Sequence, residues 1–541
     1  MHAALADRVR QHGTFFPLAV PGSGSLYEMI TGLAARAGLT LEPGLAQQLV
    51  DDTGAAPGGL ALLAFAQHEL YEAGVTDRQL TRKAYRAFNG VKGAIAKRAD
   101  TTLDGLPTAV QAALPSVFGE LVEVDERGLA TRRRAALDGV AASMEAGKLI
   151  DAFTKARLLV TDSGPSGVSI VEVAHEALLR EWPRLATWIT ERADDLRLMR
   201  QVEAAASEWV RADRDSHYLW PQERLTPVDA AIARLGKARQ TLEESVRSFI
   251  QPEVDRIQTE PLSPATTHQR RAAIGDRLDK LGDPRTGVGL RRDGVPDIVW
   301  CAVPSGTVSF EYGQGTFTVP SFLMAKYPVT YRQYKTFLDD DDGYRSEQWW
   351  TDLKREESPG EQYRPTANHP AENVSWYDAI AYARWLSVKL GYEVRLPTEA
   401  AWQQAATSGE PSFEYPWGAQ WGEHHADTNE TRLSRTIAVG MYPAGVSRQG
   451  LYDISGNVWE WCLDLYEQPG VVAIKVEQTR SKSKTSRDDD PMRVRRVVRG
   501  GSWVNLRDDA RAACRNDVGP GDRGDLIGFR LLSVSPILLN R

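Results

Sequence analysis

The cysteines and histidines of this chain are the side chains best suited to metal or redox chemistry, and their spacing argues against both. Only three cysteines occur in 541 residues, Cys301, Cys462 and Cys514. They are odd in number and far apart, so we expect neither a disulfide framework nor a cysteine-based zinc site. His424 and His425 are adjacent. They cannot share one face of a helix as metal ligands spaced four residues apart do, so we expect no metal there.

Two carboxylates near residue 455 are better placed to hold a hard cation. Asp453 and Glu460 flank a short segment in which the carbonyl oxygens of Gly456 and Val458 add further ligands. Calcium takes roughly six to eight oxygen ligands, and mixed side-chain and carbonyl ligation suits it. We therefore predict a structural calcium site made of these four residues. The alternative is that the two carboxylates only cap the amides of a turn.

No segment has the spacing of a nucleotide phosphate loop. Such a loop needs closely spaced glycines followed by a lysine, and the pattern G-x-x-x-x-G-K-[ST] occurs nowhere in the chain. Residues 21–25, Pro-Gly-Ser-Gly-Ser, lack both the lysine and the spacing. We therefore expect no bound nucleotide and no ATP hydrolysis.

The overall composition indicates a water-soluble protein of several domains. A chain of 541 residues is too long for one hydrophobic core. The net charge of −7 gives no general basic face for nucleic acid. No apolar run reaches the roughly 18 residues of a membrane span, and the N-terminus lacks the apolar region of a secretion signal. We expect a cytoplasmic protein that binds no membrane.

Residues 1–250 are predicted to be mostly helical. Leu60, Leu63 and Leu70 fit one buried helix face, and Leu198, Val202, Ala205 and Trp209 fit another. A different order occurs over 136–192: a helix, a strand at 157–161, a turn, a strand at 168–173, and a helix from about 175. Helix, hairpin and helix are typical of a winged helix. We thus divide this half into a helical region 1–135, a winged helix 136–192 and helices over 193–250.

The chain changes character in its second half. Residues 251–290 are polar and are interpreted as a linker with a short helix over about 269–281. Eleven of the 15 tryptophans follow residue 291, so 291–541 is predicted to be one domain. Ser375 and Thr398 are predicted to cap two helices there, and the rest to form short strands and long loops. The fold class is therefore multidomain, a helical region followed by an α+β domain.

The motifs of this second half occur in a characteristic order. They are YPVT at 327–330, PAENVSW at 370–376, RLPTEAAW at 395–402, YPWG at 415–418, GLYDISGNVWEW at 450–461, RGGSW at 499–503 and IGFR at 527–530. In these motifs, residues 291–534 resemble the formylglycine-generating-enzyme and sulfatase-modifying-factor family. The resemblance implies a C-type-lectin-like fold with long loops. It also implies structural calcium at the positions of Asp453, Gly456, Val458 and Glu460.

The resemblance does not extend to the family's chemistry. Enzymes of this family bind copper through two cysteines shortly after the Gly-Gly-Ser motif, because Cu(I) prefers thiolates. Asn505 and Ala510 stand at those positions here. A related branch that forms sulfoxides with non-haem iron needs a histidine cluster, which is absent from the sequence. We therefore expect no catalytic residues and no copper. The alternative function is an oxygen-dependent formylglycine-generating enzyme or a related non-haem metal oxidase.

Four segments of the first half also occur in a familiar order. They are GGLALLAFA at 58–66, FNGVKGAI at 88–95, ARLLV at 156–160 and VAHEALLREWPRL at 173–185. They resemble the distal part of a bacterial STAND signal-transduction NTPase. We expect this chain to be a fragment or a degenerate remnant of such an NTPase, with an upstream NTPase or signalling partner. The resemblance gives His175 a nucleotide-sensing role, whereas the simpler interpretation is that His175 caps a helix.

The end of the chain has a second resemblance. Residues 499–530 resemble the variable region of proteins diversified by retroelements, whose mutable residues face a ligand from the same fold. Polar, varied side chains on a rigid scaffold suit such a surface. Catalytically inactive family members have similar ends, which is the alternative. The predicted ligand-binding residues are Trp503, Asn505, Leu506, Asp508, Asp509, Asn516, Asp517, Asp522, Arg523 and Asp525.

Together these observations predict a non-catalytic sensor. Its C-terminal surface is expected to bind a protein or a small molecule and to act with the STAND-like region. Nucleic acid is not an expected partner, because the helix at about 176–188 carries Glu176 and Glu181 beside Arg180 and Arg184.

Overall fold

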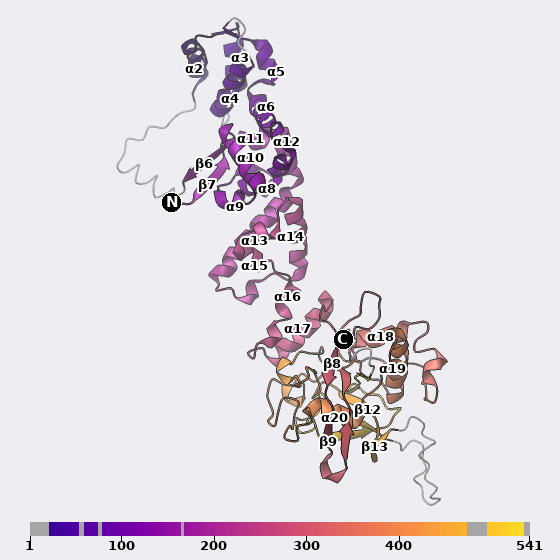
Figure 1. Cartoon of the computed structure of the whole chain (residues 1–541). Helices are drawn as coiled ribbons and strands as arrows, with labels where there is room; N and C mark the ends of the chain where they lie inside the picture. Colours follow the sequence, from indigo (N-terminus) through magenta and orange to yellow (C-terminus); the bar gives the residue numbers. More distant parts are fainter. Residues whose placement is uncertain (1–20, 54–58, 74–77, 164–166, 473–494, 535–541) are drawn as a thin grey trace, which may run out of the picture. The chain divides into compact units, whose positions relative to one another are not determined.

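The computed structural model describes residues 21–53, 59–73, 78–163, 167–472 and 495–534. The chain forms two compact units, Met1–Gln251 and Pro252–Arg541 (Figure 1). The first unit is largely helical, and the second combines helices with short strands. This coarse division agrees with the predicted fold class. None of the helices in the described part of the chain is long and apolar enough to cross a membrane.

The first part of the helical unit packs its helices around one apolar core. Its helices are α2 (Ser23–Arg36), α3 (Leu45–Thr53), α4 (Gly59–Glu72), α5 (Arg82–Ala87), α6 (Gly90–Asp104) and α7 (Thr108–Gln111), with a short parallel pair, β1 (Thr40–Leu41) and β2 (Gln79–Leu80). In α4, Leu63 and Leu70 are buried as predicted. Leu60 is exposed instead, because Leu62 and Ala66 complete the buried stripe.

The predicted order of helix, hairpin and helix is confirmed in the middle of this unit. After α8 (Leu114–Leu121) and the pair β3 (Val122–Val124) and β4 (Ala130–Arg132) come β5 (Ala135–Ala136), α9 (Leu137–Val140), α10 (Met144–Lys155), β6 (Leu159–Ser163), β7 (Ser169–Val173), α11 (Ala177–Glu181) and α12 (Pro183–Glu191). The strands form a sheet in the order β5-β7-β6. The first hairpin strand begins at Leu159 and not at 157, because Arg157 has a left-handed φ of 61°.

Three further helices complete the first unit: α13 (Ala193–Arg211), α14 (Gln222–Arg234) and α15 (Glu244–Phe249). Val202 and Trp209 lie on the buried face of α13, as predicted, whereas Leu198 and Ala205 are partly buried at its border. Trp209 packs against Phe249 of α15 with a ring-centroid distance of 6.0 Å.

The second unit begins earlier than the sequence suggested. Its first helices, α16 (Glu253–Ile257) and α17 (His268–Leu281), lie in the segment interpreted as a linker. Ile274 and Leu278 of α17 share a core with Ile437 and Met441. The helix at 269–281 was thus predicted, but the linker over 251–290 was wrong. The apolar face of α17 is narrow, and the residues against which it packs, such as Ile437 and Met441, lie far away in the sequence.

The rest of the second unit is built around small, mainly antiparallel sheets, in which β16 pairs with β12 in parallel. The main sheet has the order β13-β12-β14-β15, with β16 beside β12. Its strands are β12 (Trp459–Leu465), β13 (Gln468–Val472), β14 (Arg496–Arg499), β15 (Arg515–Val518) and β16 (Ile527–Gly528). A second sheet has the order β17-β11-β8, from β8 (Trp300–Val303), β11 (Phe322–Ala325) and β17 (Leu532–Ser533). The hairpin β9 (Gly306–Ser309) and β10 (Thr316–Val319) stands apart from both sheets.

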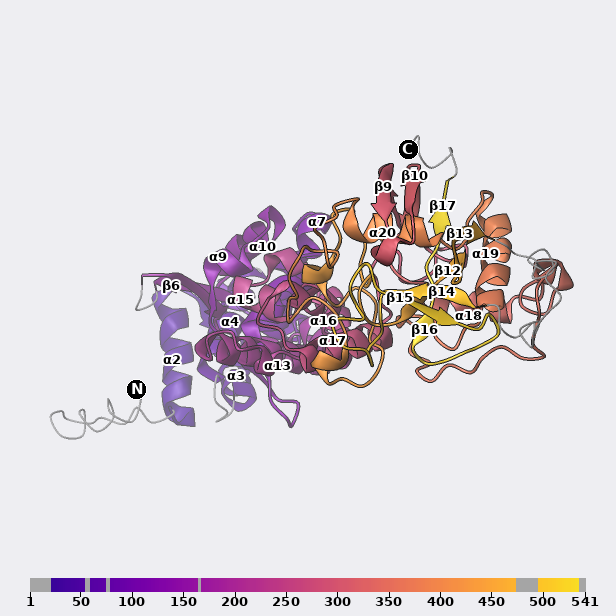
Figure 2. The same ribbon diagram turned by 90° about the horizontal axis from the view of Figure 1, so that it is seen from below.

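Three helices of this unit frame the main sheet. They are α18 (Tyr331–Asp339), α19 (Trp376–Leu390) and α20 (Glu399–Thr407). Figure 2 shows α19 along one side of the main sheet and α20 with the β9–β10 hairpin along another. Both predicted caps are confirmed: Ser375 accepts from the amide of Asp378, and Thr398 accepts from the amide of Ala401. Long loops connect these elements, as the sequence predicted.

Candidate ligand-binding site

A polar cavity of about 170 Å³ lies where three loops of the second unit meet. Tyr363, Arg364 and Glu372 come from the loop before α19. Residues 434–436 come from the loop that faces α17, and Trp503 and Asp525 come from the segment after β14. A left-handed turn at Gly500 and Gly501, with φ of 98° and 71°, leads the chain from β14 to Trp503.

Glu372 is the buried acid of this cavity. Only 1% of the residue is exposed, and its Oε1 accepts a hydrogen bond of 2.6 Å from the backbone amide of Arg364. Burial, together with the neighbouring charge of Asp525, raises the pKa of Glu372 to about 7. The indole Nε1 of Trp503 donates to the backbone carbonyl of Asp525 at 3.2 Å. Trp503 and Asp525 therefore lie in the same wall of the cavity.

Arg435 connects the cavity with α17. Its guanidinium donates to both carboxylate oxygens of Asp276, at 3.1 and 2.7 Å. The buried His369 lies 3.4 Å from the same carboxylate. Burial alone would raise the pKa of Asp276, but hydrogen bonds from His369 and Arg435 outweigh it and hold that pKa well below its usual range. Asp276 is thus a charged partner that neutralises Arg435.

The predicted ligand-binding residues do not form one cluster. Trp503 and Asp525 line the cavity. Leu506 and Asp508 are exposed on the adjacent loop, and the carboxylate of Asp509 accepts from the side-chain Nδ2 of Asn505 at 3.3 Å.

The four predicted residues on and after β15 lie in a second group. Arg495 pairs with Asp517 at 3.2 Å and approaches Asp522 at 3.9 Å. Asn516 is exposed on β15. Arg523 was predicted to be an exposed contact, but it is partly buried and donates to both oxygens of Asp378, at 2.9 and 3.0 Å. Because Asp378 is a buried helix-capping residue, the structure gives Arg523 a packing role.

The two positions that would carry copper thiolates are both integrated into the scaffold. The side-chain oxygen of Asn505 accepts from the indole of Trp459 at 2.9 Å and from the hydroxyl of Ser502 at 2.6 Å. Ala510 is fully buried, and its backbone lies close against Gly501. These side chains offer no soft ligand for copper.

The residues predicted to hold calcium fit that ion poorly. Both oxygens of Glu460 accept from Arg530, at 2.7 to 2.9 Å, and Trp402 donates to Oε2 at 2.8 Å. Oδ2 of Asp453 accepts from the amide of Gly440, and the carbonyl of Gly456 accepts from the amide of Val458. A buried guanidinium beside Glu460 would repel a divalent cation. These oxygens therefore already accept hydrogen bonds from other groups of the protein.

The rings of the adjacent residues His424 and His425 pack against different aromatic side chains. The ring of His424 lies 4.9 Å from that of His268 on α17, and the ring of His425 lies 4.9 Å from that of Trp417. Within the described ranges, no group of three or more His, Cys, Asp or Glu side chains can hold a metal ion.

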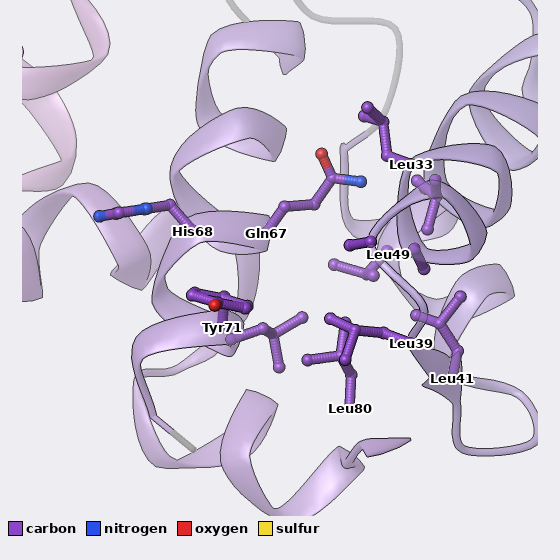
Figure 3. Close-up of a pocket in the computed structure, with 12 residues that line it drawn as sticks. Leu33, Leu39, Leu41, Leu49, Gln67, His68, Tyr71 and Leu80 are labelled. Carbon is purple, nitrogen blue, oxygen red and sulfur yellow. The ribbon is translucent and has the colours of Figure 1, made fainter. Parts of the chain in front are cut away.

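An apolar cavity of about 260 Å³ lies in the first unit, between α2, α4 and the β1–β2 pair. Figure 3 shows Leu33, Leu39, Leu49 and Leu80 around it, with Gln67 directed toward Leu33 and His68 directed away from the leucines. The cavity offers apolar surface but no charged lining side chain apart from His68. We therefore place the candidate site at the polar cavity of the second unit.

Six of the eight residues that line the polar cavity were missed by the sequence analysis. Glu372 lies inside the motif at 370–376, which was used only to identify the fold. A glutamate among apolar motif residues was a usable signal. Residues 434–436 carried no such signal, because only the folded loop brings them beside Trp503.

Two family models match the chain. Residues 1–217 match "Novel STAND NTPase 1", and residues 292–534 match "Sulfatase-modifying factor enzyme 1-like domain". Both resemblances inferred from the motifs are thereby confirmed at the level of the two regions.

Several curated proteins are similar to parts of the chain. The serine/threonine-protein kinase Pkn1 of Chlamydia trachomatis is 34% identical over 221 residues, which are 39% of this chain and 33% of the kinase. The formylglycine-generating enzyme of Thermomonospora curvata is 29% identical over 298 residues, 42% of this chain and 91% of the enzyme. The hercynine oxygenase of Mycolicibacterium thermoresistibile is 26% identical over 423 residues, 62% of this chain and 90% of the oxygenase. The chain thus spans only about a third of the length of the kinase relative.

Two solved structures are similar at low identity. Treponema denticola variable protein 1 is 22% identical with a TM-score of 0.33, and the match covers 44% of this chain and 96% of that protein. PvdO from Pseudomonas aeruginosa is 22% identical with a TM-score of 0.34, covering 46% of this chain and 99% of PvdO.

Proposed function

We propose that this chain, which joins a STAND NTPase-like region to a sulfatase-modifying-factor domain, is a non-catalytic ligand-binding sensor. The observation that carries the proposal is the polar cavity around Trp503 and Asp525, next to thiolate positions occupied by Asn505 and Ala510. The site keeps a shaped, polar recess but has no group that can activate oxygen. In this proposal the domain has the C-type-lectin-like form of its family, and residues 136–192 form a winged helix.

The contact between the cavity and α17 supports a signalling role. Arg435 lines the cavity and is bound by Asp276 of α17. In the sequence, α17 lies near the end of the helical unit and is separated from it by α16. A ligand that displaces or tightens Arg435 would change the contacts of α17, and this gives the sensor a physical route toward the STAND-like region. An upstream NTPase or signalling protein is the proposed partner, and the cytoplasm is the proposed location.

Retroelement diversification is a finer part of the proposal. Leu506, Asp508, Asn516 and Asp522 are exposed, so substitutions there would leave the core intact. Asn505 and Arg523 are unsuited to variation, because both are bound to buried partners. A template repeat matching the codons for 499–530, beside a reverse-transcriptase gene, is the observation that tests this part.

The absence of catalysis is tested directly with a sulfatase peptide that contains the cysteine to be oxidised. The full chain is incubated with this peptide, copper and oxygen, and the peptide mass is measured. We expect no formylglycine above a control without protein, because Asn505 and Ala510 offer no thiolate. The double variant Asn505→Cys, Ala510→Cys and an active formylglycine-generating enzyme are the matched controls. Formylglycine produced by the unmodified chain would favour the alternative, an oxygen-dependent oxidase.

A further inference from the structure

The polar cavity contains an excess of negative charge, which narrows the class of ligand it can hold. Glu372 and Asp525 are its two acids, and Arg364 and Arg435 its two bases. Arg435 is neutralised by Asp276 through two hydrogen bonds. Among the ion pairs of the described residues, neither Glu372 nor Asp525 has a cationic partner at contact distance. Arg364 is exposed at the rim, and its charge affects Glu372 less than that of Asp525 does.

The arrangement of the two acids is costly unless a cation joins them. The backbone amide of Arg364 holds one carboxylate oxygen of Glu372, and Asp525 lines the same cavity. The segment of Asp525 is fixed by the hydrogen bond from Trp503 to its carbonyl. Two carboxylates that line one small cavity repel each other when both are ionised, and a cation between them removes that repulsion.

We propose that Glu372, Asp525 and Trp503 form a binding site for an organic cation, a protonated amine or a guanidinium group on an aliphatic stem. The inference rests on the proposed function, because it gives the ligand chemistry of the same cavity. The two carboxylates accept hydrogen bonds from the cationic head group, and the indole and the exposed Tyr363 supply the aromatic surface that such a cation prefers.

Other classes of ligand suit the cavity less well. A phosphate or carboxylate would meet two acids, while the one enclosed base is already paired. A bare divalent cation needs roughly six oxygen ligands, and an indole wall supplies none. The volume of about 170 Å³ admits one side chain or small amine and excludes a larger ligand as a whole. The head group can belong to a free amine or to a basic side chain of a peptide.

The ionisation of Glu372 should appear in the binding curve. The charge of Asp525 raises the pKa of this carboxyl, and the positive charge of Arg364 acts in the opposite sense. Arg435 lines the same cavity but is paired with Asp276. With a pKa of about 7, Glu372 is mostly neutral at pH 6 and mostly ionised at pH 8. Affinity for a cation whose own charge is constant in this range should therefore rise about tenfold from pH 6 to pH 8.

The test compares three blocked amino acids as ligands of the full chain. The probes are N-acetyl-arginine methylamide, the citrulline analogue, which is neutral and of equal shape, and the glutamate analogue, which is anionic. Dissociation constants come from ligand-observed NMR titration. We expect the arginine probe to bind at least about tenfold more tightly than either of the others. A pentapeptide with a central arginine between alanines distinguishes the sources: tighter binding than the single residue indicates a peptide, and weaker binding a free cation.

Two variants assign the effect to the cavity. Glu372→Gln and Asp525→Asn should each weaken arginine binding about tenfold, and Glu372→Gln should also remove the pH dependence. Asp339→Asn, which removes an exposed acid of α18 outside the cavity, should change nothing, and melting curves verify that all variants fold.

Equal binding of the arginine and citrulline probes, unchanged binding by Glu372→Gln, or no binding of the arginine probe at about 10 mM would each overturn the cation site. Binding of the neutral or anionic probe that is lost in Trp503→Ala would overturn the cation site yet leave the sensor function intact. The peptide-oxidation assay tests that function independently.

Discussion

The two units of this chain stabilise their interiors in different ways. Among the described residues of the first unit, the buried polar residues are Thr53, Glu69 and Asp195, and the side chain of Lys237 is 4% exposed beside Glu120. The second unit has many more, including four arginines with less than 2% exposure: Arg271, Arg496, Arg499 and Arg530. The first unit is therefore held by apolar helix faces, and the second depends on buried charged groups.

The difference follows from the amount of regular structure in each unit. Helices satisfy their own backbone hydrogen bonds, so apolar packing completes the first unit. The second unit buries loops whose carbonyl groups have no strand or helix partner. Arg530 donates to the carbonyls of Ala325 and Tyr452 as well as to Glu460, and Arg499 donates to the carbonyl of Ala512. In this unit, buried arginines replace the hydrogen bonds that regular structure would supply.

The largest expected effect tests this dependence at Arg530. The variant Arg530→Leu leaves the buried carboxylate of Glu460 without its cation and several loop carbonyls without a donor. Unpairing a buried ion pair costs about 3–5 kcal/mol. Urea denaturation should show this loss in the free energy of unfolding of the second unit.

The matched control lies in the first unit, where Arg184 pairs with Asp104 at 3.0 Å. The two side chains are 51% and 63% exposed, so Arg184→Leu should cost less than about 1 kcal/mol. Similar losses in the two variants would show that the two units do not differ in this way.

A smaller effect is expected for the packing of α17. A Cβ atom at Gly275 would lie 2.6 Å from the Cβ of Ala438, whereas a Cβ at Gly147 in α10 of the first unit would meet nothing within 4 Å. Gly275→Ala should therefore destabilise the second unit by about 1–3 kcal/mol. Gly147→Ala should stabilise the first by about 0.5–1 kcal/mol, because alanine favours a helix more than glycine does. Thermal unfolding of both variants gives the signs, and a gain at Gly275 would contradict the tight contact.

The next effect depends on pH and concerns Glu372. Its folded-state pKa of about 7 lies above its ordinary value of 4.5, so the folded protein retains a proton that the unfolded chain has lost. The resulting stabilisation is complete below about pH 4.5 and is lost as the pH rises through about 7. Relative to the wild type, Glu372→Gln should therefore gain about 2 kcal/mol between pH 5 and pH 8. A constant difference between the two proteins across this range would refute the raised pKa.

The smallest expected effect is that of calcium. Because Arg530 and Trp402 occupy the oxygens of Glu460, excess calcium should move the melting temperature by no more than about 1 °C relative to a chelator. A bound ion at a hundredfold excess over its dissociation constant would add about 2.7 kcal/mol. A clear increase that disappears in Asp453→Ala would restore the calcium site predicted from the sequence.

The contrast between the units also explains what the sequence could predict. Helical periodicity gave the buried positions Leu63, Leu70 and Trp209 of the first unit. In the second unit, hydrophobic periodicity and helix caps predicted α19 and α20, but the loops could be predicted only from the resemblance of the motifs to a known family. Their arrangement depends on contacts such as that of Arg530 with Tyr452, 78 residues away, which no local pattern encodes.

The candidate site was predicted only where it coincides with a motif. Trp503 ends the Gly-Gly-Ser-Trp motif and Asp525 lies shortly before the Gly-Phe-Arg motif, and both line the cavity. Arg523 belongs to the same interval and is polar, but its partner Asp378 lies 145 residues earlier. Polarity and position alone could not separate a ligand contact from an internal ion pair.

The contacts of α17 also determine where this protein can be divided. Residues 252–290 cover an apolar surface formed by Ile437, Ala438, Met441 and Tyr442, and the buried Arg271 donates to the carbonyl of Met441. A recombination point at residue 291, where the motifs begin, would separate this cover from the surface it protects. The unit that can be exchanged, in natural shuffling or in engineering, therefore begins at Pro252 and includes α17.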